Sequence, residues 1–158
     1  MSATAPNIFA DLRAKYLSMS RPDGDPWDTS PSAPWGVIME IAYPQAIVTT
    51  VTFSDGTVSV LRSTGGGFFG GGDEGVQSAG KAFLNQARFS SSRMLPVTEF
   101  PPPKSGDVTF YLREIKGVTS IALSELAVQL KDHPLYPFYC AGLRVLHEYL
   151  RLQKKLST

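Results

Sequence analysis

Three runs of alternating apolar and polar residues, joined by two short turns, occupy residues 35–63. Pro44-Gln45 separates the first run from the second, and Asp55-Gly56 separates the second from the third. Asp-Gly is a strong hairpin signal, because both central residues of a tight hairpin turn need positive φ. The pattern predicts a three-stranded antiparallel meander. Its third strand is expected to be covered on one face and open to solvent on the other.

A glycine-rich segment, residues 64–72, follows the third predicted strand and leads into a predicted helix. Asp73 is a good N-cap residue and Glu74 lies in the first turn, so we expect this helix over about 73–88. Its inward stripe contains alanine and glycine. These small residues predict that the helix packs closely on the sheet.

The second half of the chain predicts a loop, two strands and a last helix. The loop is proline-rich and polyproline-like. Residues 124–131 stay ambiguous, because Val128 interrupts the helical spacing of Leu126 and Leu130. In the last helix we expect Pro134 at the first helical position, which proline tolerates. The loop, the strands and the helix are expected at about 95–107, 108–113, 118–123 and 132–155.

The N-terminal segment has the pattern of a short amphipathic helix over about residues 7–19. Apolar residues recur there at near-helical spacing, at Ile8, Leu12, Tyr16 and Met19. Such a helix is marginal alone, so it must dock on this domain, on a second copy or on a partner. Residues 20–34 contain four prolines and predict a tether without regular structure. The chain is therefore divided into a helix at 1–19, a tether at 20–34 and a single α+β domain at 35–158.

The order of elements predicts an α+β two-layer sandwich. An antiparallel sheet of about five strands, in the order α-βββ-α-ββ-α, is expected to have its helices mainly on one face. This succession resembles the small bacterial chaperones of type III secretion, which share it element for element. Those chaperones are usually acidic, whereas this chain has a net charge of +1. The stretch 34–72 also resembles bacterial proteins to which no activity is attached.

Composition excludes several classes of function. A net charge of +1, without long runs of one sign, argues against a nucleic-acid or anionic-membrane interface. The single cysteine excludes an internal disulfide and any multi-cysteine metal site. No apolar run is long enough for a membrane span or a signal peptide. We therefore expect a cytoplasmic protein that uses no cofactor and binds neither nucleic acid nor membrane.

The glycine-rich segment is the only candidate in the sequence for a small-molecule site. Backbone N–H groups before a helix can cradle a phosphate. The segment nevertheless matches neither the P-loop nor the dinucleotide fingerprint, and Asp73 and Glu74 would repel an anion. Phe68 and Phe69 offer another role: the segment is a turn if both point inward and a partner-binding tip if one points outward. The glycines of the candidate cradle are Gly65, Gly66, Gly67, Gly70, Gly71 and Gly72.

No catalytic constellation is visible in the sequence. His147 follows Cys140 by seven residues, which separates them by ~10 Å along a helix and prevents a direct hydrogen bond. Cys140 is expected to be a small buried apolar residue. His133 and His147 are ~21 Å apart on one helix and cannot share a metal ion. We therefore expect no catalytic residues and no metal site.

These observations favour a non-enzymatic protein-binding module, of the chaperone, adaptor or immunity type. It would mask an apolar segment of another protein by strand addition or helix docking. We also expect a homodimer, formed through a sheet edge or the last helix. Trp27, which lies in the tether, could contact such a partner, or it could fold back and fix the tether to this domain's own core. The alternative hypothesis is a ligand-binding domain or small enzyme that uses the glycines of segment 65–72 as an anion cradle. The predicted partner contacts are Trp27, Phe68, Phe69, Ile8 and Leu12.

Overall fold

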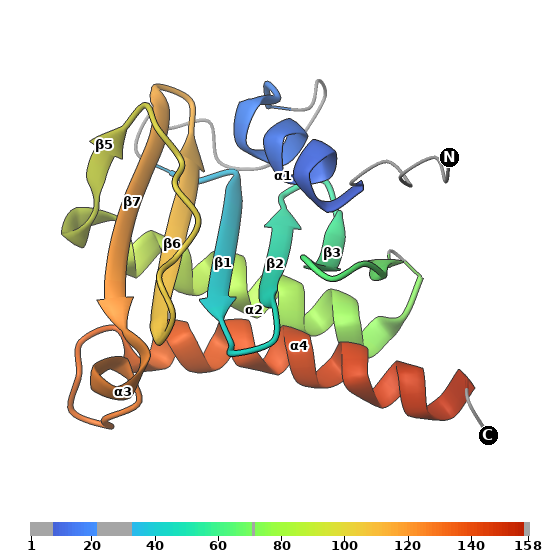
Figure 1. The fold of residues 1–158 in the computed structure, drawn as a ribbon. Helices are drawn as coiled ribbons and strands as arrows, with labels where there is room; N and C mark the ends of the chain where they lie inside the picture. Colours follow the sequence, from blue (N-terminus) through green and yellow to red (C-terminus); the bar gives the residue numbers. More distant parts are fainter. Residues whose placement is uncertain (1–7, 22–32, 71, 157–158) are drawn as a thin grey trace, which may run out of the picture.

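The computed structural model describes residues 8–21, 33–70 and 72–156, and shows an α+β fold in which helices pack against one antiparallel sheet (Figure 1). The predicted α+β class and the predicted succession of helices and strands are confirmed, with β4, β5 and α3 as additions. The elements are α1 (Ile8–Ser18), β1 (Gly36–Ala42), β2 (Ile47–Phe53), β3 (Val58–Arg62), β4 (Gly67–Gly70), α2 (Glu74–Ser90), the 3-10 helix η1 (Ser91–Arg93), β5 (Leu95–Val97), β6 (Asp107–Glu114), β7 (Gly117–Ser124), α3 (Glu125–Val128) and α4 (Tyr136–Leu156).

The strands lie in the order β4-β3-β2-β1-β6-β7-β5, and every neighbouring pair is antiparallel. β1, β2 and β3 are consecutive neighbours, which confirms the predicted meander. Their register places Val51 opposite Ile38 on one side and opposite Ser59 on the other. The strands from β3 to β5 form the main sheet, and the short β4 extends it at one edge. β1 lies in the middle, and all its residues are buried.

Two short strands lie where the sequence predicted loops. Gly65 and Gly66 have φ angles of 106° and 82°, which L side chains rarely adopt, and they reverse the chain so that β4 pairs with β3. At the opposite edge of the sheet, β5 pairs with β7. Strands of three or four residues carry too few alternations to be distinguished from a loop in the sequence.

The last helix begins at Tyr136, so the prediction that Pro134 is its first residue was wrong. A turn precedes the helix instead. The ring Nδ1 of His133 accepts a hydrogen bond from the N–H of Leu135 at 3.0 Å, and the carbonyl of His133 accepts one from the N–H of Tyr136 at 3.0 Å. Proline suits turns as well as helix starts, so the residue type alone does not place the boundary.

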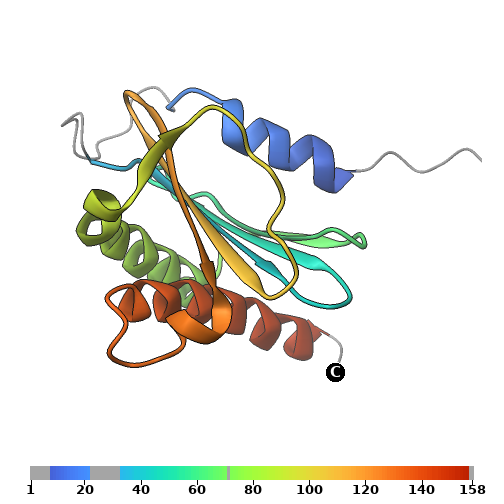
Figure 2. The same ribbon diagram turned by 60° about the vertical axis from the view of Figure 1, so that its left-hand side comes forward.

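The main core lies between the sheet and the helices α2 and α4, which run side by side over one face (Figures 1 and 2). Phe138 of α4 lies at its centre, with ring centroids 4.4 Å from that of Phe110 and 5.3 Å from that of Phe83. Gly80 of α2 faces the sheet, where an added Cβ would lie only 2.8 Å from Cγ2 of Val58. The helix can therefore lie close to the sheet because the residue at the contact has no side chain.

Gly80→Ala is expected to destabilise the protein by about 1–3 kcal/mol through overpacking. The sign of this change in stability is informative, because alanine in a helix interior otherwise stabilises the helix by about 1 kcal/mol relative to glycine. Urea unfolding measures the change. Ser78→Ala, on the exposed side of the same helix, is the control and should stay within about 0.5 kcal/mol of the natural protein. If the Gly80 variant were as stable as this control, α2 would be free to shift on the sheet.

α1 lies on the opposite face of the sheet from α2 and α4 (Figure 2). Tyr16 and Leu17 are buried against the strands, and the hydroxyl oxygens of Tyr16 and Ser59 are 3.0 Å apart. The sequence left three possible docking places for this helix: its own domain, a second copy or a partner. The structure shows that α1 docks on the sheet of its own domain. Because α1 covers the second face, β3 is buried on both sides, and the prediction that one of its faces is open to solvent was wrong.

A buried ion pair joins α1 to the central strand. Glu40 of β1 is fully buried, and the guanidinium of Arg13 donates to both of its carboxylate oxygens at 2.8 Å. The hydroxyl of Thr49 donates to the same carboxylate at 2.7 Å. Burial opposes ionisation of Arg13, but its hydrogen bond with Glu40 and the attraction of that carboxylate raise the pKa of Arg13 above its ordinary value. Arg13 therefore remains a cation when α1 is docked.

Arg113 of β6 holds the other end of α1. Its buried guanidinium donates to the carbonyl oxygens of Tyr16 and Met19, which belong to the carbonyl groups left unpaired at a helix C-terminus. The same guanidinium lies 4.7 Å from the ring centroid of Trp35. Burial lowers the pKa of Arg113 from its ordinary value, yet leaves it a cation at neutral pH. α1 is thus attached by charged contacts at both its middle and its end.

Candidate functional site

The outer edge of β7 is only partly paired. β6 pairs with the whole length of β7 on the inner side, whereas β5 pairs only with residues 118–120 on the outer side. Residues 121–124 have no strand on that side among the residues that the structure describes. In an antiparallel ladder, alternate residues direct their N–H and C=O groups to the same side. This stretch, the free edge of β7, therefore presents main-chain groups that a further strand can bind.

Exposed apolar side chains flank the free edge. Eight large apolar side chains are exposed in the described part of the chain, and four of them lie on or directly after α2, β5 and α3. Leu95, 73% exposed, is paired with the residue that precedes the free edge, and Leu126, 78% exposed, lies just after it. Phe89, in the last turn of α2 before η1 and β5, is 79% exposed, and Leu130 is also exposed. We call the free edge and these four side chains the open margin.

α3 holds Leu126 at one end of the open margin and is itself fixed by α4. The hydroxyl of Tyr139 donates to the carboxylate of Glu125 at 3.1 Å and accepts from the amide of Gln129 at 3.4 Å. Burial, with the nearby Glu125 carboxylate, raises the pKa of Tyr139 to about 12, so this hydroxyl keeps its proton at neutral pH. Val128 is buried. The short helix is therefore anchored, and Leu126 is exposed to solvent.

The two faces of β7 differ along the free edge. Ile121 and Leu123 are half-buried and pack against the main core. Ala122 and Ser124 alternate with them and are exposed. An added strand would therefore place every second side chain beside Ile121 and Leu123, extending the core by one strand.

Phe68 and Phe69, predicted to form a partner-binding tip, lie at the other edge of the sheet. They belong to β4, where they pair with Val60 and Ser59. The structure describes only their backbone, so a role for their side chains stays a prediction.

The other predicted contacts are spread along the N-terminal part of the chain. Ile8 is exposed at the start of α1. Leu12 is half-buried and packs against the cluster beneath α1, so it is engaged by this domain. Trp27 lies outside the described residues. The fold does not bring Ile8 or Leu12 to the open margin.

The glycine-rich segment forms a hairpin that leads to a capped helix, and Gly71 lies outside the described residues. Asp73 is the N-cap of α2, as predicted: its carboxylate accepts from the N–H of Val76 at 2.9 Å. The guanidinium of Arg151 donates to the same oxygen at 2.9 Å. The N–H of Val76 and the charge of Arg151 lower the pKa of Asp73 below its ordinary value. A carboxylate of the protein thus occupies the helix start at which an anion would bind.

Reactive side chains do not converge in the described part of the chain. No group of three or more His, Cys, Asp or Glu side chains lies close enough together there to hold a metal ion. Cys140 is half-buried rather than buried, and the His133 ring is used in the turn before α4. None of the described helices is both long and apolar enough to cross a bilayer.

No protein-family model matches the chain, and it has no match among curated proteins or solved structures. The function must therefore be inferred from the geometry of the chain itself.

The sequence analysis missed the open margin, although one signal of it was present. Leu126 and Leu130 recur at helical spacing, with Val128 between them. In the structure Val128 is the inward residue and the two leucines are exposed. Two outward leucines beside a single inward residue do not contribute to the core. They therefore indicate an exposed apolar surface with another role.

Proposed function

We propose that this protein is a non-enzymatic protein-binding module that masks an extended apolar segment of a partner protein. The observation that carries the proposal is the free edge of β7, bounded by the exposed Leu95 and Leu126. The partner segment adds as a further strand beside residues 121–124. Its alternate side chains lie next to Ile121 and Leu123, and its flanks contact the two exposed leucines.

The energetics favour an extended, apolar occupant. Main-chain hydrogen bonds at a sheet edge supply affinity without regard to sequence, and alternate side chains supply specificity. Fully covering one exposed leucine contributes about 1.5–3 kcal/mol relative to leaving it in water. A short segment on this margin would bury less surface than a standard protein–protein interface of about 1,600 Å². Reversible binding is therefore expected, as masking of a partner segment requires.

A chaperone-like role is the form of this function that we favour, with adaptor and immunity-type roles as the related forms. What supports it is the resemblance of the predicted order of helices and strands to that of the type III secretion chaperones. A homodimer that uses the same edge is the competing arrangement, because a second copy could also supply the added strand.

Ala122→Lys is expected to weaken binding of an extended peptide at the open margin by roughly tenfold or more, since charged side chains on an edge strand oppose strand addition. Ala122 is exposed, so the fold should tolerate the lysine. The probe is a short synthetic peptide of alternating valine and threonine. Backbone amide shifts in NMR spectra of the full chain measure the binding, and the shifts should be concentrated in residues 118–124.

Ala82→Lys is the matched control, because Ala82 is exposed on α2 and away from β7. It should bind the peptide as the natural protein does. Equal binding by the two lysine variants would contradict strand addition at this edge. A dimer in sedimentation experiments that Ala122→Lys dissociates, and that the peptide does not, would assign the edge to a second copy instead.

A further inference from the structure

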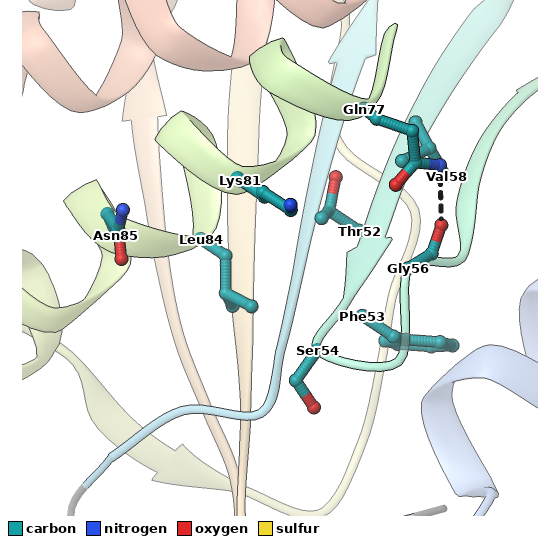
Figure 3. A pocket seen from close by; sticks show the side chains of 9 residues that line it. All are labelled: Thr52, Phe53, Ser54, Gly56, Val58, Gln77, Lys81, Leu84 and Asn85. Carbon is teal, nitrogen blue, oxygen red and sulfur yellow. Dashed lines mark hydrogen bonds between the residues drawn. The ribbon is translucent and has the colours of Figure 1, made fainter. Parts of the chain in front are cut away.

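A separate pocket of about 190 Å³ lies between α2 and the turn that joins β2 to β3 (Figure 3). Five residues of the hairpin form one wall, and four residues of α2 form the other. The lining residues are Thr52, Phe53, Ser54, Gly56 and Val58 of the hairpin and Gln77, Lys81, Leu84 and Asn85 of α2. The amide nitrogen of Gln77 donates to the carbonyl oxygen of Gly56 at 2.8 Å. This bond ties the turn to the helix, so the pocket is already formed without a ligand.

Thr52 lines the pocket and has a buried hydroxyl without a partner. Thr52 is 3% exposed, and its Oγ1 makes no hydrogen bond to any described residue. Buried hydroxyl groups in proteins normally have a hydrogen-bond partner, so this one is an exception. The same oxygen is closed off from solvent, so a ligand in the pocket contacts Thr52 without reaching this group.

The pocket carries one positive charge. Lys81 is the only charged residue that lines it, and Figure 3 shows its side chain extending from α2 toward Thr52. No carboxylate of the described residues forms an ion pair with Lys81. Asp55, in the adjoining turn, is not a lining residue, and its carboxylate accepts from the N–H of Thr57. The charge therefore favours an anionic ligand.

The volume and the lining of the pocket limit which anions can bind in it. Phe53, Val58 and Leu84 supply apolar walls. A cavity of about 150 Å³ in another protein holds benzene, so the present pocket has room for one small ring or a short branched chain with a polar group. Nucleotides need the larger sites, of about 300 Å³ or more, that drug-sized ligands occupy.

We propose that this pocket binds a small organic carboxylate with a compact apolar body. The carboxylate accepts a hydrogen bond from the Lys81 ammonium, and the body lies against Phe53, Val58 and Leu84. The proposal is independent of the open margin, whose residues on β7, β5, the last turn of α2 and the α3 segment do not line this pocket.

The test is an NMR titration of the full chain with benzoate, with benzyl alcohol as its uncharged analogue and inorganic phosphate as a second anion. Benzoate is expected to give saturable shifts at Thr52, Gln77 and Lys81. Lys81→Met keeps the aliphatic stem and removes the charge, and should weaken benzoate binding roughly tenfold while leaving benzyl alcohol unaffected. Lys131→Met, at an exposed lysine outside the pocket, should bind benzoate like the natural protein.

Thr52→Val supplies a second variant of nearly equal shape. It should leave both benzoate binding and stability unchanged, because the hydroxyl it removes has no partner in the free protein and is closed off from the pocket. The proposal is overturned if benzoate causes no saturable shifts at the pocket, or if Lys81→Met binds it as tightly as Lys131→Met does. Tighter binding of phosphate than of benzoate would overturn the assignment to carboxylates.

Discussion

Replacing Arg13 with alanine is expected to lower the free energy of unfolding by about 3–5 kcal/mol, because it leaves a buried carboxylate without its cation. Glu40 is fully buried, and both of its carboxylate oxygens accept from the Arg13 guanidinium. After the substitution the hydroxyl of Thr49 would be the one donor left to it among the residues that the structure describes. Urea unfolding followed by circular dichroism measures the loss.

Two further variants show whether the loss comes from the pair. Lys15→Ala removes an exposed cation from the same helix and should change stability by no more than about 0.5 kcal/mol. Arg13→Met combined with Glu40→Met should recover most of the stability, since apolar residues of similar size often replace a buried pair at little cost. An Arg13→Ala variant as stable as the Lys15→Ala control would mean that α1 is not fastened by this pair.

Phe138→Ala is expected to destabilise the protein by about 3–5 kcal/mol, since it removes a ring from the centre of the main core. Phe138 is buried between Phe83 and Phe110, at centroid distances of 5.3 Å and 4.4 Å. Close-packed neighbours collapse only partly into such a cavity, so packing energy is lost together with the transfer energy of the ring. The midpoint of urea unfolding measures the change.

Phe89→Ala is the matched control, because it makes the same chemical change at an exposed ring of the open margin. Its stability should stay within about 0.5 kcal/mol of that of the natural protein. Its affinity for the valine–threonine peptide should fall, which separates a binding role from a packing role. Equal destabilisation by the two substitutions would contradict the burial that distinguishes these rings.

Much of the local structure was predictable from the sequence. The alternation over 35–63 and the Asp55-Gly56 turn predicted the meander, and Asp73 marked the start of α2. These signals are local: a turn dipeptide, a cap and a period of two residues act within one or two elements. The candidate site was not predictable in the same way. The short β5 leaves half of the outer edge of β7 unpaired, and a three-residue strand gives no periodic signal.

The sequence by itself determined the longer strands and helices, because side-chain periodicity and turn chemistry depend on near neighbours. The tertiary structure alone decided that α1 covers the second face of the sheet, that Arg13 finds Glu40, and that Thr52 lines a pocket without a hydrogen-bond partner. The physical reason is that each of these facts depends on residues far apart in the chain. Arg113, for example, holds the carbonyl group of Tyr16 although 97 positions separate them. Which residues meet is set by the packing of whole elements, and no short pattern in the chain encodes it.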